Sequence, residues 1–278
     1  MSIVLVFGAS GSVGRFLLPQ LLQQHRVIAV SRAPRADGAG WINGDLNDPH
    51  MAWPQAEIAI SLGPLDAFAA WLQRYPATTL RRVIALSSMS AESKRDSIDP
   101  LERALAERLR AAETMLMGVA AERGVACTLF RPTLIYGAGT DRSLAPIARF
   151  ARRWRVLPVP LGASGLRQPV HARDLAGACA AVVASSVTFG KIYPIGGGER
   201  LRFDAMLIRL RDAVPGFVVL LPLPMVALRL AARSRHASRL SASAVARLRE
   251  SLIADNADAA RDFGYVPAAF LARDVLPH

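Results

Sequence analysis

Three glycines spaced three residues apart, Gly8, Gly11 and Gly14, have the clearest chemical meaning in this chain. They follow an apolar run at 3–7 that is rich in β-branched residues, which is typical of a buried parallel strand. Residues 15–24, which come next, carry apolar residues at helical spacing, and a second apolar run follows them. Glycines let a pyrophosphate approach the backbone, and a helix start offers it unpaired N–H groups. The sequence therefore predicts a βαβ unit that binds a dinucleotide.

The spacing of these glycines, G-x-x-G-x-x-G, resembles that of extended members of the short-chain dehydrogenase/reductase superfamily. It differs from the G-x-G-x-x-G of the simpler dinucleotide-binding fold. The extended members form the NAD-dependent epimerase/dehydratase family of nucleotide-sugar epimerases, dehydratases and related reductases. The resemblance implies that the turn holds the cofactor through Gly8, Ser10, Gly11, Ser12, Val13 and Gly14.

The end of the second expected strand, residues 27–30, indicates which nicotinamide cofactor is bound. An acidic residue there would accept hydrogen bonds from the ribose of NAD, whereas a basic one would meet the 2′-phosphate of NADP. Here Ser31 and Arg32 follow the strand, with Arg35 nearby and no acid in that slot. A guanidinium binds phosphate through paired donors, and a serine adds a hydroxyl. We predict NADP, with NAD as the second choice; the alternative is that Arg32 is simply solvated.

Two further segments are expected to border the cofactor. By the same resemblance, Asp45 and Leu46 contact the adenine. The strand expected at 58–62 ends at Leu62 and Gly63, and its end, which has small residues, would pass close to the ribose of the cofactor.

Two serines, Ser87 and Ser88, end the apolar strand expected at 83–86. Ligands in open α/β sheets bind outside the carboxyl ends of the strands. Either serine is therefore placed to meet a substrate hydroxyl or carbonyl. The alternative is ordinary capping of a turn or helix by serine.

The catalytic pair of the superfamily is missing. Its chemistry uses a tyrosine four residues before a lysine, where the lysine lowers the phenol pKa and the tyrosine moves a proton. No tyrosine of this chain has a lysine four residues later. In the helix expected at 101–121, the resemblance puts the two positions at Leu105 and Leu109, counted back from Glu113. Either another residue is the acid, or the chain binds the dinucleotide without turning it over. The catalytic candidates are Ser87, Ser88 and Tyr136, while Lys94 is expected in a polar loop as a solvated charge.

Residues 131–137, Arg-Pro-Thr-Leu-Ile-Tyr-Gly, resemble the Arg-Pro-x-x-x-Tyr-Gly stretch of extended members. The resemblance implies that Pro132 and Thr133 contact the cofactor and that Tyr136 lies toward the site. The alternative for Tyr136 is a packing aromatic whose hydroxyl bonds to a neighbour.

A second stretch, residues 168–176, resembles the Pro-Val-His-Val-x-Asp-Leu-Ala element of the family. It implies that Asp174 caps or anchors the helix that follows, which is expected to run through Val183. His171 is structural in family terms.

The missing Tyr/Lys pair and the segment 215–235 look most like one atypical branch of the superfamily, and the proline-rich runs at 158–162 and 221–224 support this. That branch contains the nucleotide-binding accessory subunit of respiratory complex I and its bacterial relatives, in which NADPH is thought to be held tightly rather than used in turnover. The resemblance makes 217–235 a surface for a peripheral membrane or protein partner. The alternative is packing within the C-terminal lobe. The cations beside this segment are Arg229, Arg233 and Arg235.

Composition limits the remaining classes. Hydrophobic residues make up 52% of the 278 residues, which excludes a disordered chain. The chain has two cysteines and no Cys/His cluster with metal-ligand spacing, so neither a disulfide scaffold nor a metal site is expected. The net charge of 34 − 22 = +12 comes nearly all from arginine. We do not expect nucleic acid as a partner, because the arginines are not interleaved with aromatics; an anionic ligand or membrane surface explains the charge as well.

The expected location follows from what the sequence lacks. The first residues have no basic n-region, and no run reaches the ~20 apolar residues of a membrane span. We predict a cytoplasmic protein, with the periphery of the inner membrane as the alternative.

The fold class that we predict is α/β, a Rossmann-like doubly wound parallel sheet of seven or so strands with a small C-terminal substrate lobe. Residues 1–130 form the dinucleotide-binding domain, joined by a strand and helix from about 165–195. Residues 131–278 form mainly the lobe. The expected substrate is a small molecule, either a nucleotide sugar or another carbonyl or hydroxyl compound. The function is then an NADP-dependent oxidoreductase or epimerase-like enzyme, and the alternative is a non-catalytic NADPH-binding structural, assembly or regulatory factor.

Overall fold

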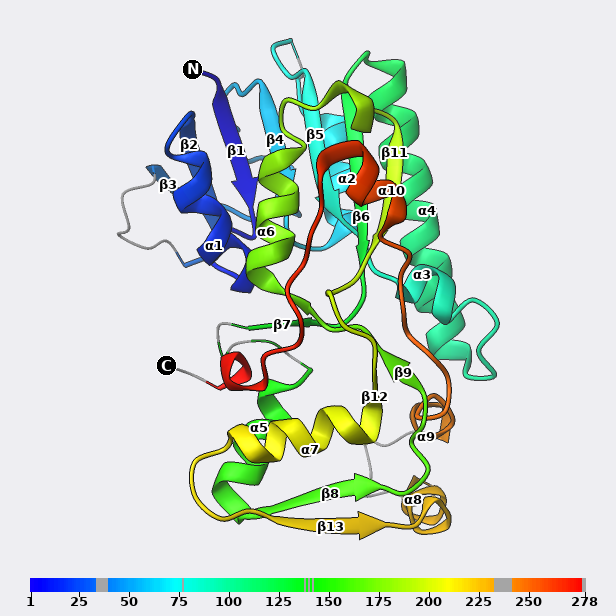
Figure 1. Ribbon diagram of the computed structural model, residues 1–278. Helices are drawn as coiled ribbons and strands as arrows, with labels where there is room; N and C mark the ends of the chain where they lie inside the picture. The colour runs from blue at the N-terminus through cyan, green and yellow to red at the C-terminus, as the bar shows by residue number, and fades with distance from the viewer. Residues whose placement is uncertain are drawn as a thin grey trace.

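A seven-stranded parallel sheet forms the centre of the molecule (Figure 1). The computed structural model describes residues 1–33, 40–76, 78–137, 139, 141, 143–232 and 242–276. The strand order is β11-β6-β5-β4-β1-β2-β3, and each neighbouring pair is parallel. The strands are β1 (Ile3–Phe7), β2 (Arg26–Ser31), β3 (Gly40–Asn43), β4 (Ile58–Ser61), β5 (Arg82–Leu86), β6 (Ala126–Pro132) and β11 (Lys191–Ile195). The predicted Rossmann-like doubly wound sheet is confirmed. The order in which successive strands are added to the sheet switches sides between β1 and β4, which is where such folds bind ligands.

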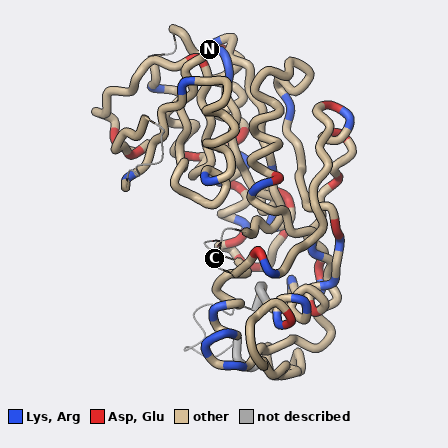
Figure 2. The backbone as a smooth tube through the Cα atoms, turned by 60° about the vertical axis from the view of Figure 1, so that its left-hand side comes forward, with Lys and Arg blue, Asp and Glu red and all other residues tan. Residues whose placement is uncertain are grey.

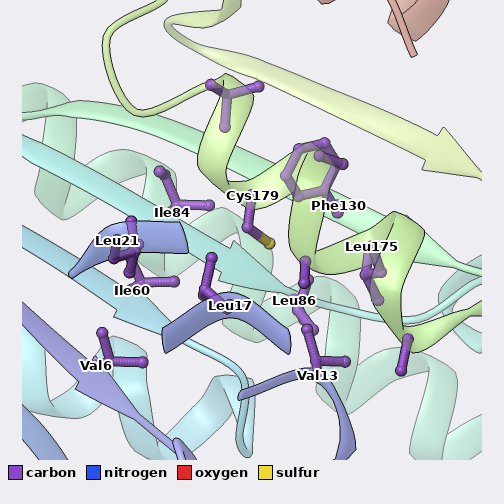
Figure 3. Close-up of a cluster of buried hydrophobic side chains, with 14 of the residues drawn as sticks. Val6, Val13, Leu17, Leu21, Ile60, Ile84, Leu86, Phe130, Leu175 and Cys179 are labelled. Carbon is purple, nitrogen blue, oxygen red and sulfur yellow. The ribbon is translucent and has the colours of Figure 1, made fainter. Parts of the chain in front are cut away.

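Helices cover both faces of this sheet, because its strands carry apolar side chains on both sides. In β1, Val4 and Val6 lie in one buried cluster, whereas Leu5 and Phe7 lie in another. The first cluster is covered by α1 (Ser12–Leu21) and α6 (Ala172–Ala181), the second by α2 (Leu65–Arg74) and α4 (Pro100–Glu122). Figure 3 shows Leu17 of α1 and Cys179 of α6 beside Ile60 and Ile84 of the sheet.

A smaller lobe lies beyond the carboxyl ends of the strands (Figure 1). Its core joins α5 to α7 and to a two-stranded parallel sheet of β8 and β13. Two short strand pairs, β7 with β10 and β9 with β12, connect it to the central sheet. The elements of this region are β7 (Ile135–Tyr136), α5 (Ala145–Trp154), β8 (Val156–Pro160), β9 (Leu166–Arg167), β10 (Val170–His171), β12 (Leu201–Arg202), α7 (Phe203–Ala213), β13 (Val219–Leu223), α8 (Met225–Ala232) and α9 (Ala242–Ala246). Further short helices are α3 (Ser90–Ser93), η1 (Ser186–Thr188), α10 (Ala257–Phe263) and η2 (Ala272–Val275).

Residues 257–275 contact both parts of the molecule. Ala259 and Tyr265 are buried in the cluster between α1, α6 and the sheet, and the Tyr265 hydroxyl donates to the Gly196 carbonyl at 3.0 Å. Phe270 and Val275 are buried in the core of the lobe. This stretch therefore ties the lobe to the sheet.

Several elements differ from the sequence expectations. Helix α1 begins at Ser12 rather than 15, since the glycine turn ends at Gly11. Helix α6 ends at Ala181 rather than Val183, and its cap is His171, whose Nδ1 accepts a hydrogen bond from the Arg173 N–H at 3.0 Å. Asp174 is not the cap; its carboxylate accepts from the Ala268 N–H at 3.0 Å and so anchors the C-terminal stretch.

The segment 217–232 contains β13 and α8. None of the helices in the described part of the chain is long and apolar enough to cross a membrane. Arg35, Arg233 and Arg235 lie outside the described residues.

Candidate functional site

The glycine turn has backbone constraints that other residues would violate. Gly8 has φ +70°, and a Cβ there would lie 3.1 Å from both the Leu62 carbonyl carbon and the Gly63 nitrogen. A Cβ on Gly14 would lie 2.0 Å from the carbonyl oxygen of Ala9. Glycine at these positions lets the turn and the start of α1 pack directly against neighbouring backbone.

The start of α1 is open to an anion. The Gly11 N–H donates to the Gly8 carbonyl at 3.0 Å and closes the turn. Gly11 is the N-cap residue of α1, and no side chain caps the helix. The first turn of a helix has N–H groups without intrahelical acceptors, and its dipole favours negative charge. The turn and the helix therefore present the donors that a diphosphate requires.

Two cavities lie on either side of this turn. The larger has a volume of 840 Å³ and runs along the turn and the carboxyl ends of β5 and β6. The smaller has a volume of 200 Å³ and lies beside the ends of β2 and β3. Gly8 and Ser10 line both cavities, so the glycine turn lies between them. The pair has room for the two ends of a dinucleotide with the diphosphate at the turn.

Most residues predicted to bind a cofactor line one of the two cavities. The larger is lined by Gly8, Ser10, Gly11, Ser12 and Val13 of the turn, and by Leu62, Pro132 and Thr133 at the strand ends. The smaller is lined by Ser31, Arg32, Asp45, Leu46 and Gly63. Gly14 lines neither, because it packs against Ala9.

The smaller cavity combines a basic and an acidic side chain. Arg32 is exposed at its border. The Ser31 hydroxyl lies 3.0 Å from the Ser10 hydroxyl and accepts a hydrogen bond from the Ala33 N–H at 3.1 Å. Asp45 Oδ1 accepts from both the backbone N–H and the side-chain amide of Asn47, at 2.9 and 3.0 Å. Arg32 is the one cation among the described residues that line this cavity.

The two candidate serines have different environments. Ser87 donates from its hydroxyl to Glu113 Oε1 at 2.5 Å and lines neither cavity. Ser88 lines the larger cavity, and its Oγ accepts a hydrogen bond from the Ser90 N–H at 3.1 Å. Its hydroxyl proton is thereby available to a ligand in the cavity. Of the two, the structure brings Ser88 to the site.

A buried ion pair lies behind these serines. Glu113 of α4 is 3% exposed and accepts from Arg131 Nε at 2.9 Å and from its terminal nitrogen at 2.5 Å. Arg131 also bonds to Glu92 at 2.7 Å, and Glu113 raises the pKa of the guanidinium. The sequence reasoning used Glu113 only to count positions and missed this network, although the Arg-Pro stretch and the Ser-Ser pair both contribute to it.

Tyr136 is not in the cavity, contrary to the expectation that it lies toward the site. Its ring is 1% exposed and packs edge-on to His171 and Phe270, with centroids 5.0 and 4.9 Å apart. Its hydroxyl accepts from the Leu271 N–H at 3.1 Å, and burial raises the pKa of Tyr136 to about 12. Neighbouring residues of a strand point to opposite sides. Ile135 lines the cavity, so Tyr136 points away from it.

The positions counted back from Glu113 do not supply an acid. Leu105 and Leu109 lie on α4, and neither lines the larger cavity. Lys94 does not line it either; it is paired with Glu102, its nitrogen 3.6 Å from the carboxylate.

Asp141 is a site residue that the sequence reasoning missed. It is 7% exposed and lines the larger cavity. Its Oδ1 accepts from the N–H groups of Ser143, Leu144 and Ala145 at 3.0, 2.6 and 3.0 Å, just before and at the start of α5. Its Oδ2 is buried without a partner. An aspartate before an apolar stretch is the one signal that could have suggested this cap.

Solved structures of nicotinamide-dinucleotide complexes have a similar fold. MoeE5 in complex with UDP-glucose and NAD matches with a TM-score of 0.74 and 18% identity, over 98% of this chain and 95% of that one. A short-chain dehydrogenase/reductase superfamily protein from Agrobacterium tumefaciens with bound NAD matches with a TM-score of 0.71 and 14% identity, over 98% of this chain and 94% of that one. RMD from Pseudomonas aeruginosa, complexed with NADPH, matches with a TM-score of 0.70 and 16% identity, over 99% of this chain and 97% of that one. Protein-family models and curated proteins gave no match.

At these identities the likeness shows the fold. The chain has the Rossmann-like fold of short-chain dehydrogenase/reductase and epimerase proteins that bind NAD or NADPH. The fold implied by the glycine spacing and the Arg-Pro stretch is therefore confirmed, while the likeness does not test the atypical branch.

Proposed function

We propose that the chain is an NAD(P)-binding protein of the epimerase/dehydratase type that prefers NADP. The observation that carries the proposal is the glycine turn beside a helix start without a side-chain cap. Gly8 has a positive φ and approaches neighbouring backbone closely, and a Cβ at Gly14 would collide with the backbone of Ala9. These features form an anion cradle between two cavities, and the residues present fit a dinucleotide diphosphate.

The preference for NADP rests on the end of β2. Arg32 lines the smaller cavity and is exposed, whereas Asp45 Oδ1 is already bonded to Asn47. A guanidinium beside the adenosine ribose would pair with a 2′-phosphate.

The larger cavity supports chemistry at a small carbonyl or hydroxyl compound. A bound nicotinamide would accept or supply a hydride there. The Ser88 hydroxyl would donate a hydrogen bond to the substrate oxygen, and Thr133 and Pro132 would border the nicotinamide. Arg15 is the one cation among the described residues that line this cavity. A nucleotide sugar, which MoeE5 holds, is the first substrate class to test.

A cytoplasmic location is part of the same proposal. Cys127 and Cys179 are buried free thiols, and burial raises the pKa of each to about 12. Buried neutral thiols of this kind suit a reducing compartment.

The test begins with the native protein. Mass spectrometry of the small molecules released on denaturation should identify NADP(H), and calorimetric titration should give tighter binding for NADPH than for NADH. The protein should then change the near-ultraviolet absorbance of the reduced nicotinamide on addition of a carbonyl substrate. Ser88→Ala should slow this reaction about 10–100-fold, while Ser87→Ala, in the neighbouring residue outside the cavity, tests whether any serine loss has that effect.

A non-catalytic cofactor-binding factor is the second candidate. The resemblance puts the catalytic tyrosine and lysine of the family at Leu105 and Leu109. Neither leucine can move a proton, which favours this candidate. None of the described residues that line the larger cavity is a tyrosine or lysine. Cofactor that co-purifies and stays in one redox state with every carbonyl and nucleotide sugar tried would select this candidate.

A further inference from the structure

Among the described residues, α5 and α7 cover one face of the β8–β13 sheet, and the other face carries exposed apolar side chains. Leu157 and Val159 of β8 pack with Leu220 of β13 into the cluster that α5 and α7 cover. Side chains alternate along strands, so Val156, Pro158, Val219 and Leu221 point the other way. Val219 pairs with Val156, and Leu221 with Pro158. We call these four residues the outer face.

All four residues of the outer face are apolar, and the two on β13 are exposed. Val219 and Leu221 are each 45% exposed, whereas Val156 and Pro158 are half-buried. Parallel sheets usually have both faces covered. In Figure 1 the helices of the lobe, α5 and α7, lie on one side of β8 and β13.

Two aromatic side chains extend the apolar surface at one end of this sheet. Trp154, the last residue of α5, is 61% exposed, and Phe217, just before β13, is 82% exposed. They flank Arg155, whose terminal nitrogen donates to the Pro215 carbonyl at 2.5 Å and whose carbonyl accepts from the Val219 N–H at 2.9 Å. Exposed aromatic side chains beside arginine are typical of interfacial membrane contacts.

The segment that contains α5 and β8 carries positive charge without acids to balance it. Residues 143–165 contain four arginines, Arg149, Arg152, Arg153 and Arg155, and no Asp or Glu. Arg152 and Arg153 at the end of α5 are exposed. Figure 2 shows blue stretches without red at the lower left of the lobe.

The charge and the apolar side chains together identify the occupant. A second copy of this chain would bring a like-charged surface, which opposes association. A nucleic acid would match the charge but not the uncovered valine, leucine and phenylalanine side chains. An anionic bilayer matches both, because its acyl region accepts apolar side chains and its headgroups attract arginine.

We propose that the outer face, with Trp154 and Phe217, docks on an anionic lipid bilayer. The proposal does not depend on the cofactor or on turnover, since this surface is built from β8, β13 and the end of α5. It would bring the protein to a membrane surface without a spanning segment.

The experiment is flotation of the full chain with vesicles of phosphatidylcholine alone or with phosphatidylglycerol added. The protein should bind the anionic vesicles at least ~10-fold more strongly than the neutral ones, and added NaCl should release it. Phe217→Ser should weaken binding to anionic vesicles ~10-fold, whereas Val266→Ser should not. Val266 is the matched control, because it is 89% exposed and lies outside the lobe segments named above.

A second variant separates charge from apolar contact. Arg152→Gln with Arg153→Gln should reduce the salt dependence of binding, and both side chains are exposed, so the fold is retained. Equal flotation with neutral and anionic vesicles, or no flotation at all, would overturn the proposal. So would a dimer in analytical ultracentrifugation that Phe217→Ser dissociates, or binding to duplex DNA that Phe217→Ser abolishes.

Discussion

The Glu113 carboxylate accepts a hydrogen bond from the Ser87 hydroxyl at 2.5 Å, and so connects the middle of α4 to the end of β5. The same carboxylate is bound by Arg131 of β6. One buried acid thus fixes the ends of two strands beside the larger cavity and leaves the adjacent Ser88 facing that cavity.

We expect Glu113→Ala to lower the free energy of unfolding by about 3–5 kcal/mol, because it leaves Arg131 partly buried without its main partner. Urea denaturation measures the change. Glu122→Ala, in an exposed residue of the same helix, is the control and should change stability by less than about 0.5 kcal/mol. Equal losses in the two variants would mean that the network does not stabilise the fold.

Gly14→Ala should lower stability by at least about 3 kcal/mol, since the new Cβ would lie 2.0 Å from a backbone oxygen that cannot move without shifting the turn. NADPH binding, followed by calorimetry, should be lost with it. Gly118→Ala on α4 should have the opposite effect and raise the free energy of unfolding by about 1 kcal/mol. Alanine favours the helix, and nothing lies within 4 Å of the position that the new Cβ would take. Thermal unfolding of the pair gives the comparison.

Arg32→Gln should weaken NADPH binding by about 10–100-fold, which corresponds to the loss of about 1.5–3 kcal/mol from hydrogen bonds to a charged phosphate. The affinity for NADH should stay the same, because NADH has no 2′-phosphate. Arg26→Gln at the opposite end of β2 is also an exposed arginine and serves as the control. Equal effects on NADPH and NADH would remove the argument for NADP.

Asp141→Ala should destabilise the protein by about 1–2 kcal/mol, because three N–H groups at the start of α5 lose their acceptor. Asp141→Asn keeps the capping oxygen and should change stability by less than about 0.5 kcal/mol. Thermal unfolding distinguishes the two. A large loss in the Asn variant would show that the second carboxylate oxygen, which has no partner here, also supports the fold.

Burial lowers the pKa of His171 below its usual 6.5, against the opposing effect of Asp274. The unfolded chain then binds more protons than the folded one between the two pKa values, so His171 should make stability fall as the pH drops through and below 6.5. Protonation would also end the hydrogen bond that Nδ1 accepts from Arg173. In His171→Asn this part of the pH dependence should be absent, as urea midpoints measured across acidic pH would show.

The elements that the sequence predicted well are those defined by neighbouring residues. The turn from Gly8 to Gly14 and the strand before it form one local unit, so spacing alone located them. By contrast, neighbouring residues do not determine the direction in which a side chain points at the end of a strand. Ser87 and Ser88 are adjacent and identical, yet the first bonds to Glu113 and the second lines the cavity. That distinction depends on a helix about 25 residues away along the chain, which spacing does not place.

Long-range pairing explains two features that the sequence did not predict. Tyr136 turns away from the cavity because β7 pairs with β10, which brings His171 against its ring. Similarly, β13 pairs with β8, about 60 residues earlier, and this pairing divides the segment 217–232 into a strand and a helix. Neither partner strand is evident from residues near these positions.

The stretch 257–275 has Tyr265 buried against the sheet and Phe270 and Val275 buried in the lobe. Unfolding of either part would expose buried side chains of this stretch, which couples the unfolding of the two parts. We expect calorimetry to record a single cooperative transition for the two parts, and a disulfide or proline placed in this stretch to shift both together.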